Sequence, residues 1–340
     1  MDKIEIFEET DRNKKQGKLY IVVPCYNEEE ALETSAHSLI KKLEDLTTKG
    51  LISEESRIVF VDDGSKDKTW QIIQSLFKKE EKVMGLRFAH NRGHQNAILA
   101  GMMYARKYCD FVITIDADLQ QDIEAMDRFI KEYYAGNEIV FGVRNSRNTD
   151  SFFKKSTATI FYKLMHFLGC NIYENSADYR LMSAKALDAL SEYEEVNLFL
   201  RGIIPDIGLK TSVVHFDVFP RMQGESKYSL SKMLTLGVDG ITSFSIKPIR
   251  MVFMMGVAAL IMGFCMIVHV FYEHYFGTTV SGWSSILASI WLLGGAILLA
   301  LGIIGEYLSV ILGEIRRRPI YLVRDTVNLE KEQEKENEYI

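Results

Sequence analysis

Carboxylate side chains follow three apolar runs of the sequence, at the point where each run stops. The runs end in Pro24-Cys25-Tyr26-Asn27-Glu28, in Asp62-Asp63-Gly64-Ser65 and in Asp116-Ala117-Asp118-Leu119-Gln120. Carboxylates that lie close together repel one another unless a cation sits between them. Asp116 and Asp118 are two residues apart, so in an extended segment they face the same side. Because Mg²⁺ and Mn²⁺ prefer such oxygen ligands together with substrate phosphates, the three ends predict a site for a divalent cation and a nucleotide.

These acidic residues also have a purely structural interpretation. Asp118 or Asp122 could cap the helix that follows it. Asp62 and Asp63 could shape a turn. A single Asp-X-Asp motif is weak evidence for a metal site. Three acidic strand ends in one sheet are stronger evidence and favour the cation site.

The segment from residue 18 to residue 220 alternates strand-like with helix-like patterns. Apolar runs that stop at polar clusters predict strands at Leu19–Val23, Arg57–Val61, Val83–Phe88, Phe111–Ile115 and Glu138–Val143. Apolar residues at helical spacing predict helices at Glu29–Leu46, Thr69–Phe77, Gln95–Arg106 and Ile123–Tyr134. Such alternation is typical of an α/β fold with a mainly parallel, doubly wound sheet. Ligands of these sheets bind beyond the carboxyl ends of the strands, where the acidic clusters lie.

Several motifs resemble those of family 2 glycosyltransferases, which have the Rossmann-like GT-A fold. The resemblance is carried by Pro24–Glu28, Val61–Thr69 and Asp116–Gln120. Later motifs resemble the polyprenyl-phosphate glycosyltransferases of that family, and these are Asn91–His94, Ser176–Leu181, Arg221 and Gly224–Tyr228. The nearest forms are bactoprenol glucosyltransferases, and dolichyl-phosphate mannose synthases are more distant. The resemblance covers about residues 18–325 and is specific for the subfamily but not for the sugar.

The resemblance implies a role in nucleotide-sugar binding for each matching residue. The residues expected to line the nucleoside pocket are Pro24, Tyr26, Glu28 and Asp63. The residues expected to hold the Mg²⁺ or Mn²⁺ ion that bridges the donor diphosphate are Asp116, Asp118 and Gln120. Asp116 thus belongs to both sets, and Asp118 is expected to be essential for catalysis. The departing UDP gains negative charge, which the metal ion stabilises.

Basic residues and one further aspartate complete the expected site. The candidates for phosphate binding are Arg180, Arg201, Arg221 and Lys155. A guanidinium offers a planar fork that fits phosphate oxygens, and a surface ion pair is the alternative for each arginine. Asp178 is expected to act as a general base or to orient the acceptor, although it could equally hold Arg180. The need for a base is modest, because a lipid phosphate is largely a dianion at neutral pH. His94 opens a helix whose N-terminus could face a phosphate, with capping or packing as the alternative.

Two stretches near the C-terminus contain no Asp, Glu, Lys or Arg. They run over residues 251–272 and 274–305, and the most apolar part of the second is 284–304. Each reaches the roughly 20 residues that cross about 30 Å of hydrocarbon. We therefore predict a transmembrane hairpin with spans at about 251–272 and 284–304. A pair of buried helices in a soluble core is the alternative.

Basic residues predict the orientation of this hairpin. Lys247 and Arg250 precede it, Arg316–Arg318 follow it, and the loop at 273–282 has neither Lys nor Arg. By the positive-inside rule, both termini and the catalytic domain lie in the cytoplasm. Glycines that would allow close helix packing, and with it a homo-oligomer, are Gly294, Gly295, Gly302 and Gly305.

The chain is expected to have five parts. These are an N-terminal extension at 1–17, a cytoplasmic GT-A catalytic domain at 18–226, an interfacial helix region at 227–249, the hairpin at 250–306 and a cytoplasmic C-terminal segment at 307–340. The interfacial amphipathic helix is predicted from apolar residues at helical spacing between Leu230 and Phe244. Packing of that helix on the soluble domain is an equally good interpretation.

Composition argues against several classes of protein. A net charge of −6 disfavours a general nucleic-acid-binding protein, because phosphate binding needs a basic face. The four cysteines lie far apart with no Cys-X-X-Cys pair, which disfavours a zinc ribbon or a disulfide scaffold and fits a reducing compartment. The charged residues within positions 1–18 argue against a secretory signal peptide.

We predict from the sequence an inverting, metal-dependent glycosyltransferase of the inner (plasma) membrane. It would move glucose or an N-acetylhexosamine from a UDP-sugar to undecaprenyl phosphate, a polyprenyl phosphate, on the cytoplasmic leaflet. A separate flippase and a second glycosyltransferase would then use the product to modify a cell-envelope glycan. One alternative is a processive polysaccharide synthase, although the QxxRW motif of those enzymes is absent. Another is a non-catalytic membrane scaffold derived from a transferase.

Overall fold

The computed structural model describes the sheet-forming part of the chain and one long helix near the C-terminus. The described residues are 16–145, 176–193, 195, 200–219, 283–316 and 318–328, with seven more between 252 and 265. The chain divides into two compact units. The first comprises Met1–Tyr162, Asn171–Lys227 and Arg318–Ile340, and the second comprises Lys163–Cys170 and Tyr228–Arg317.

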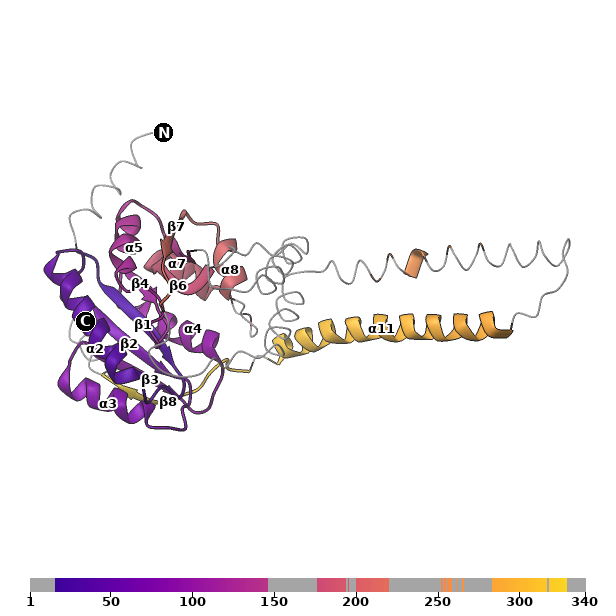
Figure 1. Cartoon of the computed structure of the whole chain (residues 1–340), viewed down its shortest axis with the longest axis horizontal. Coiled ribbons are helices and arrows are strands. Elements are labelled where there is room, and N and C mark those ends of the chain that lie inside the picture. The colour runs from indigo at the N-terminus through magenta and orange to yellow at the C-terminus, as the bar shows by residue number, and fades with distance from the viewer. Residues whose placement is uncertain are drawn as a thin grey trace, which may run out of the picture. The chain divides into compact units, whose positions relative to one another are not determined.

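The first unit is built on one mixed sheet of eight strands in the order β7-β5-β6-β4-β1-β2-β3-β8 (Figure 1). Four of the seven neighbouring pairs are parallel, so the prediction of a mainly parallel α/β sheet is confirmed. The strands are β1 (Leu19–Cys25), β2 (Arg57–Asp62), β3 (Val83–Phe88), β4 (Phe111–Thr114), β5 (Ile139–Arg144), β6 (Ser176–Ser183), β7 (Thr211–Phe216) and β8 (Val323–Val327).

Helices pack on this sheet through one apolar face each. In α2, buried residues recur three or four positions apart from Leu32 to Leu46, which is the spacing of one helix face. Its apolar side chains join those of β1 and β2 in a single core that water does not reach. The helices of this unit are α2 (Leu32–Thr48), α3 (Thr69–Lys79), α4 (His94–Ala105), α5 (Ala125–Tyr134), α7 (Ala184–Ser191) and α8 (Leu200–Asp206).

Within residues 18–220, all the strands and helices predicted from hydropathy are present, with bounds that differ by a few residues. The strands β6, β7 and β8 were outside that prediction. In β6, the buried residues include Asp178 and Arg180, so its hydropathy does not mark it as a core strand. In β8, most side chains are exposed, so the segment lacks the apolar run that identifies a buried strand.

Strand β8 comes from the part of the sequence predicted as a separate C-terminal segment. It pairs antiparallel with β3 and forms one edge of the sheet. Just before it, the ring of Tyr321 stacks on that of Phe88, with the ring centroids 5.0 Å apart. The backbone N–H of Ala89 donates to the carbonyl of Leu322 at 2.9 Å. The residues that follow the long helix in sequence therefore complete the sheet.

The turn after β2 is packed against the loop that follows β3. Gly64 has a φ of +67°, and a Cβ atom there would lie 2.6 Å from the carbonyl carbon of His90. Only glycine fits this turn without displacing the neighbouring backbone. The close approach holds the Asp62–Ser65 turn against the loop that leads into α4.

The second unit contains α11 (Trp283–Ile315), a helix of 33 residues. At about 1.5 Å per residue, it is long enough to cross the hydrocarbon layer of a bilayer. Its segment Ala296–Ile315 has a mean hydropathy of 2.1, and among the described residues it is the one candidate membrane span. The predicted span 284–304 lies within α11, which continues further toward the C-terminus than predicted.

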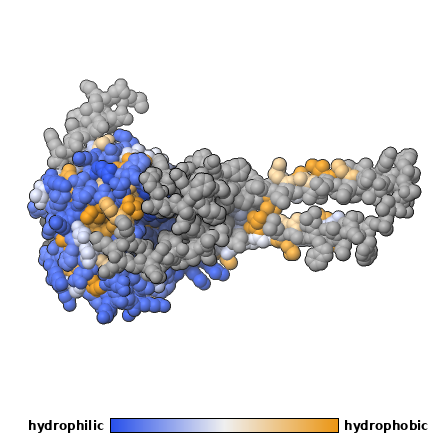
Figure 2. All heavy atoms as spheres, in the orientation of Figure 1, coloured by the Kyte–Doolittle hydropathy of each residue, from blue (hydrophilic) through white to orange (hydrophobic). Residues whose placement is uncertain are grey.

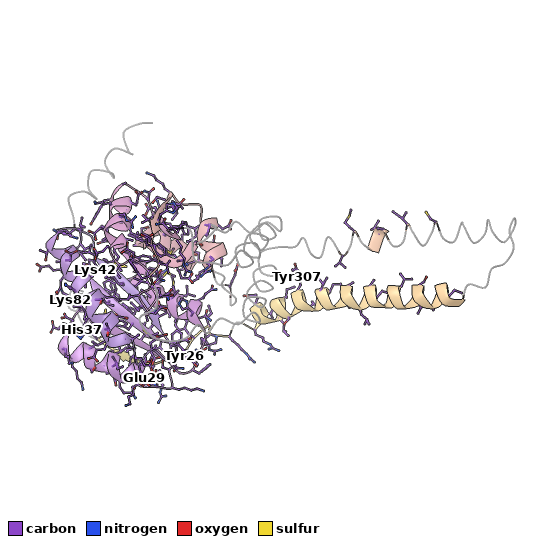
Figure 3. All side chains as sticks on the ribbon, in the orientation of Figure 1. Tyr26, Glu29, His37, Lys42, Lys82 and Tyr307 are labelled. Atoms are coloured by element: carbon purple, nitrogen blue, oxygen red, sulfur yellow. The ribbon has the colours of Figure 1, made fainter. Side chains whose placement is uncertain are left out.

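Other membrane predictions fall mostly outside the described residues. This applies to most of the first span, 251–272, and to the whole interfacial region, 227–249, so the hairpin stays a prediction. Described side chains of α11 such as Leu298 and Ile315 are 71% exposed, which is unusual for apolar residues in water. Tyr307 is labelled on this helix in Figure 3. By contrast, most of the visible surface of the sheet unit is hydrophilic (Figure 2).

Candidate active site

The acidic ends of β1, β2 and β4 come together at one edge of the sheet. In the parallel register, Cys25 pairs with Asp62 and Val22 pairs with Thr114, so the residues that follow these strands lie at the same edge. Strand β6 runs antiparallel to β4 and brings Asp178 to this edge. The Thr114 hydroxyl donates to the backbone carbonyl of Asp178.

Asp116 is held by two side chains from different elements. The Nε2 atom of His94, the first residue of α4, lies 2.9 Å from its Oδ1 atom. The side-chain amide of Gln121 donates to its Oδ2 atom. Burial alone would raise the pKa of Asp116, but the hydrogen bond and charge of His94 outweigh burial and lower it. Asp116 is therefore a carboxylate at neutral pH.

His94 is the cationic partner of this carboxylate. Burial alone would lower its pKa, but the hydrogen bond to Asp116 and the charges of Asp116 and Asp178 raise the pKa of His94 to about 9. Its Nδ1 atom lies 4.0 Å from Oδ2 of Asp178. Its side chain is 47% exposed, so the imidazolium faces both solvent and two carboxylates. One histidine thus links the ends of β4 and β6.

Asp178 lies between two guanidinium groups. Arg201, from α8, donates from Nε and Nη2 to the two carboxylate oxygens at 3.2 and 2.9 Å. Arg180, its neighbour on β6, donates from Nη2 to Oδ1. Burial would raise the pKa of Asp178, but the charges of Arg201 and Arg180 hold that pKa far below its ordinary value. A carboxylate stabilised in this way is a weak base, so the geometry favours an anchoring role for Asp178.

The two arginines differ in their access to solvent. The side chain of Arg180 is 2% exposed, whereas that of Arg201 is 36% exposed. Arg201 can therefore meet a ligand phosphate without leaving its place beside Asp178. Arg180 is buried against Asp178, which suits it to hold that carboxylate. The other phosphate-binding candidates, Arg221 and Lys155, lie outside the described residues, and their role stays a prediction.

Asp63 holds the loop that leads into α4. Its Oδ1 atom accepts the backbone N–H of Arg92 at 2.6 Å, and its Oδ2 atom accepts that of Gly93 at 2.8 Å. Burial raises the pKa of Asp63, and these two hydrogen bonds oppose the rise. Asp63 therefore positions the first turn of α4, in addition to the nucleoside contact predicted for it.

The ends of β1 and β2 are cross-linked by hydrogen bonds. The backbone N–H of Asn27 donates to the hydroxyl of Ser65 at 3.0 Å, and that of Glu28 donates to the hydroxyl of Thr69 at 2.9 Å. Pro24 is buried in β1, and Tyr26 is half-buried just beyond it (Figure 3). The residues predicted to line a nucleoside pocket are thus held together at one edge of the sheet, and their contact with a nucleoside stays a prediction.

The predicted metal ligands Asp116 and Asp118 lie in the turn after β4. The Oδ1 atom of Asp118 accepts the backbone N–H of Gln120 at 3.3 Å. Two partly exposed carboxylates at one strand end suit Mg²⁺ or Mn²⁺. Gln120 stays a predicted metal ligand. Gln121, which was not among the predicted residues, donates to Asp116, and it carries no signal in the sequence that would single it out.

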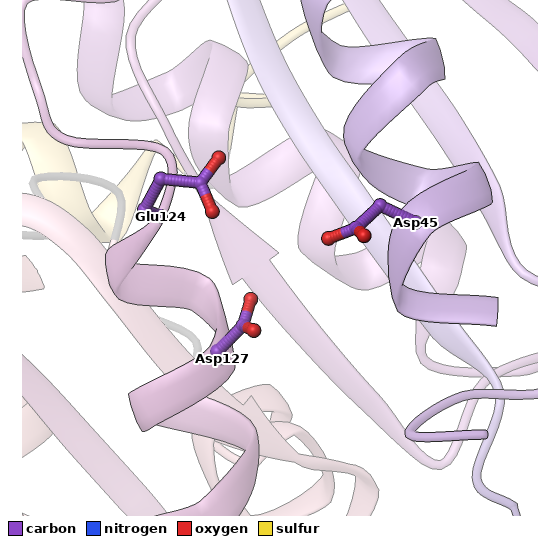
Figure 4. Close-up of side chains that lie close together, drawn as sticks. All are labelled: Asp45, Glu124 and Asp127. Carbon is purple, nitrogen blue, oxygen red and sulfur yellow. The ribbon is translucent and has the colours of Figure 1, made fainter. Parts of the chain in front are cut away.

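A second acidic group lies away from the strand ends, between α2 and α5. Carboxyl oxygens of Asp45, Glu124 and Asp127 lie within 4.8 Å of one another, and the three side chains point toward one another (Figure 4). The ammonium group of Lys42 lies 2.6 Å from both Glu124 and Asp127. Lys49 lies 2.6 Å from Asp45. Two ammonium groups thus already neutralise this group, which makes it a poor metal site.

Comparison with known proteins agrees with this geometry. Residues 20–191 match the family model for Glycosyl transferase family 2. A glycosyltransferase of Bacillus subtilis named YkoT, itself uncharacterized, is 47% identical over 91% of this chain and 92% of its own length. This chain belongs to glycosyltransferase family 2. The prophage bactoprenol glucosyl transferase homolog of Escherichia coli is 36% identical to it over 90% of this chain and 98% of its own length.

Another relative of this family 2 member is the bactoprenol glucosyl transferase of Shigella phage SfX, which is 37% identical over 90% of this chain and 99% of its own length. Among solved structures, the chain is similar to glucosyl-3-phosphoglycerate synthase of Mycobacterium tuberculosis in complex with Mn²⁺, UDP-glucose and phosphoglyceric acid. That likeness has a TM-score of 0.43 and 16% identity, and it covers 70% of this chain and 81% of the other. It carries no argument about activity.

Proposed function

We propose that this family 2 glycosyltransferase moves a sugar from a UDP-sugar to a polyprenyl phosphate, with inversion at the anomeric carbon. The observation that carries the proposal is the 36–37% identity to bactoprenol glucosyl transferases over 90% of this chain and 98–99% of theirs. The sugar is proposed to be glucose or an N-acetylhexosamine. The lipid is proposed to be undecaprenyl phosphate, which is used on the cytoplasmic leaflet of the plasma membrane.

The donor half of the proposed site is the turn after β4. Asp116 and Asp118 would hold Mg²⁺ or Mn²⁺ at the donor diphosphate, and such an ion would supply positive charge for the leaving UDP. His94 supports this half, because its hydrogen bond keeps Asp116 ionised and oriented. The nucleoside is proposed to lie against Tyr26 and Asp63 at the neighbouring strand ends.

The acceptor half is the Arg201 side of the site. The half-exposed guanidinium of Arg201 is proposed to bind the lipid phosphate while Asp178 holds it from behind. One phosphate oxygen attacks the anomeric carbon, and the bond from that carbon to the UDP oxygen breaks with its electron pair leaving on UDP. A lipid phosphate is already largely dianionic at neutral pH, so Asp178 need not remove a proton.

The acceptor chemistry ties this reaction to a membrane. A lipid phosphate cannot leave the headgroup layer without exposing its chain to water, at about 0.8 kcal/mol per CH₂ group. Helix α11 is a fitting anchor because Ala296–Ile315 is long and apolar enough to span a bilayer. A second span at 251–272, cytoplasmic termini, a homo-oligomer, and a downstream flippase and transferase are all part of the proposal.

The test is transfer of labelled sugar to lipid by the purified full-length protein in detergent. A panel of UDP- and GDP-sugars is offered with undecaprenyl phosphate, with Mg²⁺, with Mn²⁺ or with EDTA, and lipid products are separated by thin-layer chromatography. One labelled lipid formed from one UDP-sugar, and only with metal, is the expected result. A water-soluble polymer would instead indicate a processive synthase, and no transfer from any donor would indicate a non-catalytic scaffold.

A further inference from the structure

The position of Arg201 depends on the short helix that carries it. Arg201 is the second residue of α8, and its guanidinium contacts both oxygens of Asp178. Any rotation or shift of α8 would move the guanidinium relative to that carboxylate. The first turn of α8 therefore needs a fixed partner if Arg201 is to keep its geometry.

That partner is a side chain from α4. The Oε1 atom of Gln95 accepts the backbone N–H of Leu200 at 3.1 Å, across 105 positions of sequence. Leu200 begins α8, and the first N–H groups of a helix have no partner within it. Leu200 is fully buried, so water cannot easily replace the glutamine. Gln95 thus acts as a cap supplied from a distant element.

The helix that supplies this cap is itself fixed to the donor half of the site. Gly93, just before α4, is held by Asp63, and His94 at its first position is paired with Asp116. Gln95 is the next residue and points its acceptor at α8 instead. His94 thus bonds to Asp116 and lies 4.0 Å from Asp178, whereas Gln95 bonds to the start of α8.

We propose that Gln95 is a positioning residue for the acceptor phosphate, which acts by capping α8 and thereby placing Arg201. The inference rests on the proposed transfer to a lipid phosphate. Gln95 contacts α8 and leaves the donor side to His94, so its loss changes the use of the acceptor and not the binding of UDP. A general loss of stability would instead affect both acceptor use and UDP binding.

The experiment compares three substitutions in the full-length protein. Gln95→Met keeps the length of the side chain but removes the acceptor, and Gln95→Asn keeps an amide that is too short to reach Leu200. Gln95→Glu keeps an acceptor oxygen at the same distance along the side chain. The matched control is Gln74→Met on the exposed face of α3, a helix that carries none of the proposed site residues.

The readouts are the KM for undecaprenyl phosphate, kcat and the UDP dissociation constant from calorimetry. We expect Gln95→Met and Gln95→Asn each to raise the KM for the lipid about tenfold, as for one buried donor left without a partner. Gln95→Glu should recover most of that loss. The UDP dissociation constant should stay within about twofold of wild type in all variants, and the control should match wild type.

A double substitution tests whether Gln95 acts through Arg201. In an Arg201→Lys background, Gln95→Met should raise the KM for undecaprenyl phosphate by less than about twofold, because the guanidinium that Gln95 positions is already absent. An unchanged lipid KM in Gln95→Met and Gln95→Asn overturns the inference. The inference is also overturned if UDP affinity falls as much as the lipid KM rises. The same holds if the increase in lipid KM in the double variant equals the product of the increases in the two single variants. If the wild-type protein transfers no sugar to lipid phosphate, the proposed function itself fails, which is a different outcome.

Discussion

Two groups of carboxylates in the sheet unit are neutralised in different ways. The lysine cluster, made of Lys42, Lys49, Asp45, Glu124 and Asp127, lies between α2 and α5. The edge cluster, made of His94, Asp116, Asp178, Arg180 and Arg201, lies where the carboxyl end of β4 meets the first half of the antiparallel strand β6. Both bring acidic groups close together, and three carboxylates of the first have oxygens within 4.8 Å of one another.

The clusters differ in which charges face solvent. In the lysine cluster the most buried group is a cation, since the Lys42 side chain is 1% exposed while that of Glu124 is 66% exposed. In the edge cluster the Asp178 carboxylate is buried together with Arg180, and the cations His94 and Arg201 are partly open to solvent. Lys42, surrounded by carboxylates, joins α2 to α5. The partly exposed cations beside Asp178 could instead interact with an anionic ligand.

The largest expected effect separates the clusters by activity. Asp118→Asn should lower the rate of sugar transfer by about a hundredfold or more, because an amide is a poorer metal ligand than a carboxylate. The same substitution in the lysine cluster, Asp45→Asn, should leave the rate near that of wild type. Initial rates with saturating Mg²⁺ measure both. Near-wild-type turnover of Asp118→Asn would place the metal elsewhere, and an equal loss in Asp45→Asn would remove the distinction between the clusters.

The second expected effect concerns stability. Lys42→Met should lower the free energy of unfolding by about 2 kcal/mol, because it removes the shared cation from three carboxylates. The loss is smaller than for a fully buried pair, since the acidic partners are partly hydrated. Thermal unfolding of the full-length protein in detergent, followed by circular dichroism, measures it. Unchanged stability would mean that the cluster does not hold α2 to α5.

The third expected effect is a difference in response to pH. The folded chain raises the pKa of His94 from 6.5 to about 9, so its stabilising contribution is complete below pH 6.5 and is lost as the pH rises toward 9. Because the ring is half exposed, the loss should be only about 1 kcal/mol. The raised pKa of Lys42 lies above 10.5, so the lysine cluster should keep its contribution throughout this range.

This response can be measured as unfolding between pH 6 and pH 9.5 in EDTA. His94→Gln should abolish this part of the fall in stability, and Lys42→Met should retain it. A fall that persists in His94→Gln would assign the titration to another group.

The smallest expected effect sharpens the contrast within the lysine cluster. Lys49 touches two of the same acids as Lys42, but its side chain is 43% exposed. Lys49→Met should therefore lower the free energy of unfolding by less than about 0.5 kcal/mol, as for other exposed ion pairs. Thermal unfolding of the two lysine variants side by side makes the comparison. An effect as large as that of Lys42→Met would show that burial does not set the strength of these pairs.

Much of the sheet follows from local patterns in the sequence. The five predicted strands are continuous apolar runs, and the helices between them bury residues at a spacing of three or four. The strand ends then converge because parallel neighbours finish at the same edge. Strands β6 and β8 cannot be predicted in this way, because β6 buries charged residues and β8 is mostly exposed.

By itself, the sequence determined the strand-helix alternation, the acidic strand ends and the apolar stretch within α11, because each depends on residues that are close together in the chain. It also determined the family, through motifs that each occupy a few positions. Only the tertiary structure decided which groups neutralise one another. His94 reaches Asp116 across 22 positions, Arg201 reaches Asp178 across 23, and Lys42 reaches Glu124 across 82. Partnership between charges is set by distance in space and by burial, and neither can be read from spacing along the chain.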